Sequence, residues 1–141
     1  MGVYLRFEVA GEAYAMPIAH VIEVAALGQL VAIPGAPAEV LGVCDLRGQI
    51  LPVVDLAAVL KLERDTYPSR LLVTAVGAMQ AGFAVDTVAG VTELPEPAEQ
   101  SHSPVLLGAV LADGNLIGVI DVARATEGAA TSADSMQAGL P

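Results

Sequence analysis

A 16-residue segment occurs twice in this 141-residue chain, and this repeat limits the possible folds more than any other feature. When LGVCDLRGQILPVVDL (41–56) is aligned with LGAVLADGNLIGVIDV (107–122), five positions are identical and most others stay apolar. With one added residue the match extends upstream, placing Val21 over Val88 and Val24 over Val91. Each copy is typical of a hairpin followed by a helical turn. The alternative is chance similarity in a Val-rich chain; otherwise the repeat predicts two small β-subdomains that share a core.

Alternation of apolar and polar residues is the dominant local pattern, and it is typical of half-buried strands. In the run 3–9 the odd positions are apolar, while Tyr4, Arg6 and Glu8 share the other face. Asp113-Gly114 between two apolar runs is a strong hairpin signal. The sequence therefore predicts an all-β fold. The further predicted strands cover 14–18, 20–26, 41–46, 49–54, 71–77, 81–86, 88–94, 106–112 and 115–120.

Two prolines and two aspartates refine this prediction. Pro17 and Pro52 fall inside predicted strands, so we expect each at a sheet edge or bulge, where no N–H is needed. Asp55 and Asp121 each precede a short apolar stretch, which predicts that they are the N-caps of two short helices.

Composition and charge exclude several classes of protein. There are 6 basic and 16 acidic residues, a net charge of −10, which does not suit binding to nucleic acid or to an anionic membrane surface. The longest uncharged runs, 24–38 and 71–85, have 15 residues, too few to span a bilayer. The N-terminus lacks a signal-peptide pattern, and one cysteine cannot form an internal disulfide. We expect a cytoplasmic protein with one domain over residues 1–125 and a disordered tail over 126–141.

No arrangement of residues predicts catalysis. Cys44 could be a nucleophile, but in an apolar strand it is better interpreted as a small hydrophobe. His20 and His102 have no second metal ligand at a suitable spacing, so we expect no metal and no cofactor. Asp55 and Asp121 could form an acid–base pair, but their identical place in the repeat favours capping. We expect a protein that is not an enzyme.

Arg47 stands out because it lies at a β-turn in a chain with few cations. One interpretation is a solvated turn residue paired with Asp45. The other is a positive contact for an acidic partner surface. The second copy of the repeat carries Asp113 at the matching position, so the turn itself does not require an arginine.

The segment PAEVLGVCDLRGQILPVVDL (37–56) resembles the signature of the CheW-type coupling proteins of bacterial chemotaxis, with its Leu-Arg-Gly turn, a proline and a Val-Asp-Leu ending. Three further stretches agree in order and spacing: 7–17, 20–24, and the pair 83–88 with 107–122. The resemblance covers about residues 3–125. It implies two SH3-like, five-stranded β-barrels packed together.

The same resemblance implies a scaffold with no catalytic activity. Such a scaffold couples the cytoplasmic tips of chemoreceptors to the regulatory domain of the histidine kinase CheA, itself a homologue. The alternative is a module of another chemosensory system, for twitching motility or gene regulation, with different clients. Carried over by position, the receptor-facing residues are Val21, Val24, Gly42, Arg47 and Val88. The resemblance does not identify the kinase-facing edges.

Two further points concern the same region. Glu23 matches a position where the family usually has Glu, and we favour a bracing role for it over a partner contact. Asp45 replaces the usual Asn before Leu-Arg-Gly, and its charge is expected to neutralise Arg47 in part.

Overall fold

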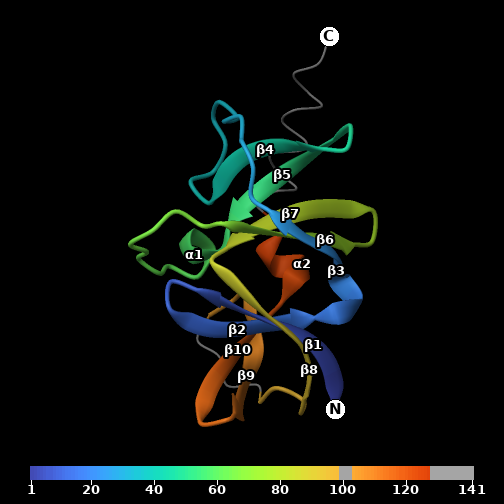
Figure 1. Ribbon diagram of the computed structural model, residues 1–141, viewed down its shortest axis with the longest axis vertical. Helices are drawn as coiled ribbons and strands as arrows, with labels where there is room; N and C mark the ends of the chain where they lie inside the picture. Colours follow the sequence, from blue (N-terminus) through green and yellow to red (C-terminus); the bar gives the residue numbers. More distant parts are fainter. Residues whose placement is uncertain (99–102, 128–141) are drawn as a thin grey trace.

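Ten strands and three short helical turns make up the computed structural model, which describes residues 1–98 and 103–127 (Figure 1). The strands are β1 Gly2–Val9, β2 Glu12–Pro17, β3 Val21–Ala26, β4 Val40–Leu46, β5 Gln49–Asp55, β6 Arg70–Val76, β7 Met79–Val85, β8 Thr87–Leu94, β9 Leu106–Ala112 and β10 Asn115–Ile120. The helical turns are η1 Ile18–His20, α1 Leu56–Val59 and α2 Val122–Ala125. The predicted all-β fold is confirmed, and the predicted strands agree with these to within two residues at every end.

Two five-stranded sheets form the two predicted SH3-like subdomains. Their strand orders are β8-β1-β2-β10-β9 and β3-β6-β7-β5-β4. We call the first the terminal subdomain and the second the middle subdomain. Figure 1 shows them stacked, with α2 between them. The opening hairpin β1–β2 thus joins the C-terminal strands, a partition that the repeat alone did not reveal.

The sequence repeat is reproduced in detail by the backbone. β3, β4 and β5 occupy the same places in one sheet as β8, β9 and β10 in the other. The register shifts at Ile22 in β3 and at Ala89 in β8, and it shifts again at Leu41 in β4 and at Leu107 in β9. Bulges at equivalent positions show that each subdomain bends in the same way.

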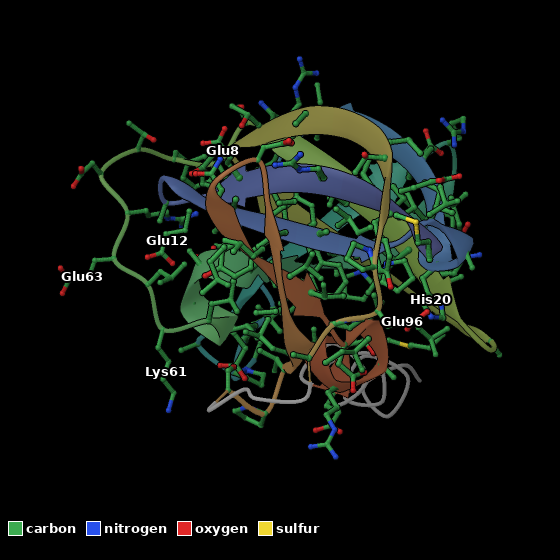
Figure 2. All side chains as sticks on the ribbon, turned by 90° about the horizontal axis from the view of Figure 1, so that it is seen from below. Glu8, Glu12, His20, Lys61, Glu63 and Glu96 are labelled. Atoms are coloured by element: carbon green, nitrogen blue, oxygen red, sulfur yellow. The ribbon has the colours of Figure 1, made fainter. Side chains whose placement is uncertain are left out.

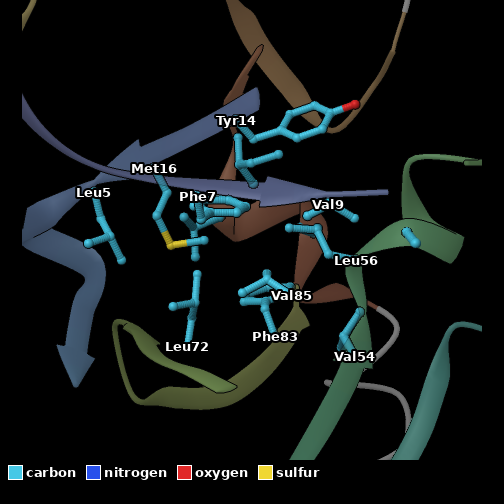
Figure 3. Close-up of a cluster of buried hydrophobic side chains, with 14 of the residues drawn as sticks. Leu5, Phe7, Val9, Tyr14, Met16, Val54, Leu56, Leu72, Phe83 and Val85 are labelled. Carbon is cyan, nitrogen blue, oxygen red and sulfur yellow. The ribbon is translucent and has the colours of Figure 1, made fainter. Parts of the chain in front are cut away.

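The largest cluster of buried side chains lies between the two sheets, as the shared interface predicts. It draws on β1 and β2 from one subdomain and on β6 and β7 from the other, and Figure 3 shows Phe7, Leu72 and Phe83 within it. Separate smaller clusters fill each subdomain, around Ile117 in the terminal one and around Leu51 in the middle one. We call the cluster between the sheets the shared core.

Both predicted N-caps are confirmed. The Asp55 carboxylate accepts a hydrogen bond from the N–H of Ala57 at 3.2 Å, and Asp121 accepts one from Arg124 at 3.2 Å. Asp55 is buried and also forms a salt bridge with Arg64 at 2.9 Å. The helix after Asp55 ends at Val59, shorter than the apolar run to Leu62 suggested.

The prediction that the two prolines lie at a sheet edge or a bulge is wrong, because neither coincides with a register shift. β2 and β5 are inner strands, each paired on both sides. Proline has no N–H to donate, but neither proline needs one for the parallel pairing, because both lie outside the short parallel ladders. β5 pairs with β7 only from Val53 onward, and β2 pairs with β10 only at Tyr14 and Ala15.

The C-terminal residues lie mostly outside the described part of the chain. Thr126, the first residue of the predicted tail, is buried, and its hydroxyl donates to the Ala123 carbonyl at 2.8 Å. The tail from residue 128 on is not described. Within the described residues, no helix is long and apolar enough to cross a membrane.

Candidate partner-binding surface

β3 and β8 are equivalent edge strands, and they carry three of the five predicted receptor-facing residues. Val21 and Val24 lie on β3 and Val88 lies on β8. Val21 and Val88 are half-buried and pack against the same shared core. Val21 and Val88, which are far apart in the sequence, therefore contact one and the same cluster.

The strand register shows which way Val24 faces. Val24 lies opposite Leu72 on β6, which belongs to the shared core, and its equivalent Val91 lies opposite Leu5 on β1, which also belongs to it. Residues directly opposite in an antiparallel pair project from the same face of the sheet. Val24 and Val91 therefore extend the face of the shared core outward, and they are 41% and 60% exposed.

We call Val21, Val24, Val88 and Val91 the apolar strip. Val91 was absent from the predicted site, although the repeat aligns it with Val24 and could have indicated it. Exposed valines on an edge strand of each subdomain are candidates for contact with an apolar partner.

Gly42 has a structural role. Its φ is +148°, and a Cβ built on it would lie 2.4 Å from the Val31 carbonyl oxygen. Val31 and Val43 exchange backbone hydrogen bonds at 2.8 and 2.9 Å, which hold the loop before β4 against the bulge. Gly108 has the same role against Ala98. Because Gly42 has no side chain, the backbone at Val31 can pack closely against β4.

Arg47 lies at the turn between β4 and β5, with φ values of +51° at Arg47 and +86° at Gly48. These values are those of a type I′ turn. The guanidinium donates from both terminal nitrogens to the Glu23 carboxylate on β3, with Nη1 3.3 Å from Oε2 and Nη2 bonded to Oε1. Because β3 and β4 are the opposite edges of their sheet, this ion pair bridges the open side of the middle subdomain.

The charges of this pair act on one another. The hydrogen bond from Arg47 holds the pKa of the Glu23 carboxyl below its ordinary value, and Glu23 raises the pKa of Arg47. The interpretation that Arg47 pairs with Asp45 is wrong. The Asp45 Oδ1 instead accepts from the N–H of Gly48 at 2.7 Å. Arg47 pairs with Glu23, and this contact agrees with the bracing role that we favoured for Glu23.

The terminal subdomain repeats this bridge with the charges reversed. Asp113 and Gly114 have φ values of +52° and +75°, which confirms the predicted hairpin turn. Asp113, the equivalent of Arg47, pairs with Arg6 on β1 at 3.3 Å. Arg6 lies opposite Gly90, the equivalent of Glu23.

The β9–β10 hairpin exposes two large aliphatic side chains near its tip. Leu111 and Leu116 lie directly opposite one another and are 74% and 69% exposed. The equivalent pair in the middle subdomain is Asp45 and Ile50, so this hairpin is apolar only in the terminal subdomain. We call Leu111 and Leu116 the hairpin pair.

The remaining reactive residues do not assemble into a site. Cys44 packs against the core of the middle subdomain, and burial raises the pKa of its thiol, which disfavours a reactive thiolate. His20 Nδ1 lies 3.3 Å from the Ala75 carbonyl oxygen, and His102 lies outside the described residues. Among the described residues, no three acidic, histidine or cysteine side chains group to hold a metal.

A cleft of about 550 Å³ opens on the terminal subdomain, near Arg6, Glu12, Tyr14 and Leu116. Figure 2 shows Glu8 and Glu12 on this side of the molecule. Three of its polar side chains already have partners, since Tyr14 donates to Glu12 at 2.9 Å and Arg6 binds Asp113. Burial, together with the Glu12 carboxylate, raises the pKa of Tyr14, which holds its hydroxyl protonated.

Comparison with known proteins agrees with the two-subdomain fold. Protein FrzA of Myxococcus xanthus is 34% identical over 119 residues, covering 83% of this chain and 72% of that protein. Chemotaxis protein CheW of Thermotoga maritima is 29% identical over 130 residues, covering 87% and 86%.

A solved structure has the same fold. It is the scaffolding protein TtCheW from Thermoanaerobacter tengcongensis, with a TM-score of 0.77 and 26% identity, and the match covers 84% of this chain and 83% of that one. The family model of the CheW-like domain matches residues 3–129. With that match spanning nearly the whole chain, the protein belongs to the CheW-like domain family.

Proposed function

We propose that this chain is a non-enzymatic, cytoplasmic scaffold that couples chemoreceptor tips to the regulatory domain of the histidine kinase CheA. The observation that carries the proposal is the apolar strip, where equivalent valines from both subdomains extend the shared core to the surface. Family membership supplies the class of partner, and two solved or curated relatives carry the names scaffolding protein and chemotaxis protein.

The receptor contact in this proposal combines the strip with the neighbouring ion pair. A receptor helix presents aliphatic side chains to Val24 and Val91, and the half-buried Val21 and Val88 let it approach closely. Arg47 is 70% exposed despite its bond to Glu23, so it remains able to contact a polar group of the partner. Gly42 contributes by letting the loop before β4 pack closely against that strand.

The kinase contact is assigned to a separate surface, the hairpin pair. A scaffold must hold two partners at once, and Leu111 and Leu116 lie on β9–β10, at the far edge of the sheet from β8. Two opposed aliphatic side chains of this exposure favour an apolar partner. As a homologue of this fold, the kinase regulatory domain is expected to present a barrel edge to this hairpin.

A module of another chemosensory system is the second candidate. The observation that favours it is the similarity to Protein FrzA, which is 34% identical where CheW of Thermotoga maritima is 29% identical. The two proposed functions differ in the receptor and kinase that the chain binds, but they use the same two contact surfaces. Binding assays with receptor and kinase fragments from each chemosensory gene cluster of the same genome distinguish them.

The experiment that tests the receptor contact measures binding of a receptor-tip fragment by titration calorimetry. Val24→Asp and Val91→Asp are expected to weaken binding at least tenfold, because each places a charge on the apolar strip. Val31→Asp is the matched control, since Val31 is similarly exposed but lies outside the strip. Equal losses for all three variants, or no binding by the unmodified chain at micromolar concentration, would contradict the receptor contact.

The kinase contact is tested in the same way with the kinase regulatory domain. Leu111→Asp and Leu116→Asp are expected to abolish detectable binding, whereas Ile50→Asp, the equivalent change in the middle subdomain, leaves it intact. Loss of binding in Ile50→Asp alone would assign the kinase to the other hairpin.

A further inference from the structure

The cleft on the terminal subdomain is a gap between two strands. β10 begins at Asn115 but pairs with β2 only at Gly118 and Val119, so the first residues of the two strands are not paired with each other. The cleft, of about 550 Å³, is lined by Ala13 on β2 and by Asn115 and Leu116 on β10. Its volume lies in the range of known ligand pockets.

The middle subdomain bridges the equivalent gap. The parallel pairing of β5 with β7 matches that of β10 with β2, and it makes Gln49 the equivalent of Asn115 and Gln80 the equivalent of Ala13. Gln49 Nε2 donates to Gln80 Oε1 at 2.8 Å, and this contact joins the two strand ends. Because Ala13 has no polar side-chain atom, the terminal subdomain cannot form such a bridge. Its gap is therefore open where the sister gap is closed.

Two carboxylates line the open cleft, Glu8 on β1 and Glu12 on β2 (Figure 2). Alternation along the hairpin puts them on opposite faces, so they reach the gap from two sides. The lining cation Arg6 is already bonded to Asp113. Among the described residues neither Glu8 nor Glu12 has an ion-pair partner, and Tyr14 donates only to Oε2 of Glu12. The cleft therefore carries two uncompensated negative charges.

Leu116 lines the cleft and also belongs to the hairpin pair, so a partner that covers the hairpin pair lies beside the cleft. We propose that the cleft receives a lysine or arginine side chain of the kinase regulatory domain. The inference rests on the proposed kinase contact. The ammonium or guanidinium group donates to Glu8 and Glu12, and its methylene groups pack against Leu116. An acidic side chain of the partner is repelled by both carboxylates.

The test titrates the kinase regulatory domain against the unmodified chain and three variants, each at low and at high salt. Glu8→Gln combined with Glu12→Gln, the charge variant, removes both charges and keeps the shape of the side chains. Ala13→Gln combined with Asn115→Gln, the bridge variant, gives the gap the two glutamines that close its sister. Glu63→Gln is the matched control, since Glu63 is exposed in the loop between α1 and β6 and does not line the cleft.

The charge variant is expected to bind the kinase domain about fivefold more weakly at low salt, because two attractive charges are gone. Its affinity should also change less with salt than that of the unmodified chain. The bridge variant is expected to lose at least as much affinity, because the glutamines occupy the gap, and the control should bind as the unmodified chain does. Thermal unfolding shows whether each variant is folded. If the bridge variant is not, the charge variant and its salt dependence decide.

Unchanged binding in the charge variant, or in a folded bridge variant, while Leu116→Asp abolishes it, would overturn the role of the cleft and leave the kinase contact standing. An equal loss in Glu63→Gln would attribute the effect to net charge and overturn it as well. Absence of kinase binding by the unmodified chain would overturn the proposed kinase contact itself.

Discussion

At the scale of single residues, the two bulge glycines hold the loops that precede β4 and β9. A Cβ at Gly42 or Gly108 would lie 2.4 or 1.9 Å from a backbone carbonyl oxygen, so the backbone must shift to admit it. Both glycines also have positive φ, which disfavours any other residue. The two glycines have the same structural role because they occupy equivalent positions in the repeat. The sequence already showed them as an aligned pair.

Gly42→Ala and Gly108→Ala are each expected to lower the free energy of unfolding by about 2 kcal/mol or more, from the clash and the strained φ together. Urea titration followed by circular dichroism measures the change. Gly28→Ala serves as the control, because a Cβ there meets no atom within 4 Å. A loss as large in Gly28→Ala would attribute the effect to glycine flexibility in general.

The Glu23–Arg47 ion pair makes the stability of the fold depend on pH. Because the pKa of Glu23 is lower in the folded chain than in the unfolded one, its contribution is fully present above the ordinary carboxyl pKa of about 4.3. It is lost as the pH falls through the lower, folded value. The difference in free energy of unfolding between the unmodified chain and Glu23→Gln should therefore shrink between pH 7 and pH 3. A difference that stays constant or grows toward acid would contradict this ion pair.

Arg47→Glu is expected to weaken receptor coupling while the fold stays intact, because an exposed turn side chain adds little to stability. Titration of the receptor tip measures the first effect and thermal unfolding the second. A loss of more than about 2 kcal/mol in the free energy of unfolding would make Arg47 a structural residue.

At the scale of elements, the two helix caps occupy equivalent positions in the repeat but differ in burial and in their contacts. Asp55 is buried and binds both Ala57 and Arg64, whereas Asp121 is part of an exposed pair with Arg124. Periodicity and capping rules were sufficient to predict both helices and both caps. They could not predict the salt bridge to Arg64, because that contact depends on how the loop after α1 folds back.

Asp55→Ala is expected to lower the free energy of unfolding by about 3 kcal/mol, since it removes a cap and leaves Arg64 without its partner. Asp121→Ala removes a cap and a weak pair with the exposed Arg124, and about 1 kcal/mol is expected. Chemical denaturation of the two variants side by side measures the difference. Equal losses would mean that burial of Asp55 adds nothing to its capping role.

The hairpins show a second limit of sequence analysis. Turn residues and the Leu-Arg-Gly resemblance located Arg47 correctly, but its partner Glu23 is 24 residues away and on the opposite sheet edge. Proximity in sequence favoured Asp45 instead. The same limit applies to Pro17 and Pro52, because the lengths of the parallel ladders are set by the closure of each barrel.

At the scale of the whole molecule, the shared core packs the two subdomains against each other, so we expect them to unfold together. Its largest side chains come from both sheets, including Phe7, Met16, Leu72 and Phe83. The repeat predicted such an interface. It could not predict that the opening hairpin would join the C-terminal strands, because the β1–β2 and β6–β7 sequences lack the aligned residues that mark the other strands.

Phe83→Ala is expected to cost about 3–5 kcal/mol while unfolding stays a single transition for both subdomains. Coincidence of thermal curves from far-ultraviolet circular dichroism and from tyrosine fluorescence measures this cooperativity. Tyr67, in the exposed loop between α1 and β6, is first replaced by Phe. The remaining Tyr4 and Tyr14 then report on the terminal subdomain, whereas Phe83 lies on β7 of the middle one. Separate transitions would show that the shared core does not couple the two subdomains.

The central claim is that one chain holds a receptor and a kinase at once, through the apolar strip and the hairpin pair. The most direct measurement is retention of the kinase regulatory domain on immobilised receptor tips, with and without this chain. The account predicts that the kinase domain is retained only when the chain is present, and that Val24→Asp and Leu116→Asp each abolish retention. Displacement of the receptor tip by the kinase domain, or retention unaffected by both variants, would contradict it.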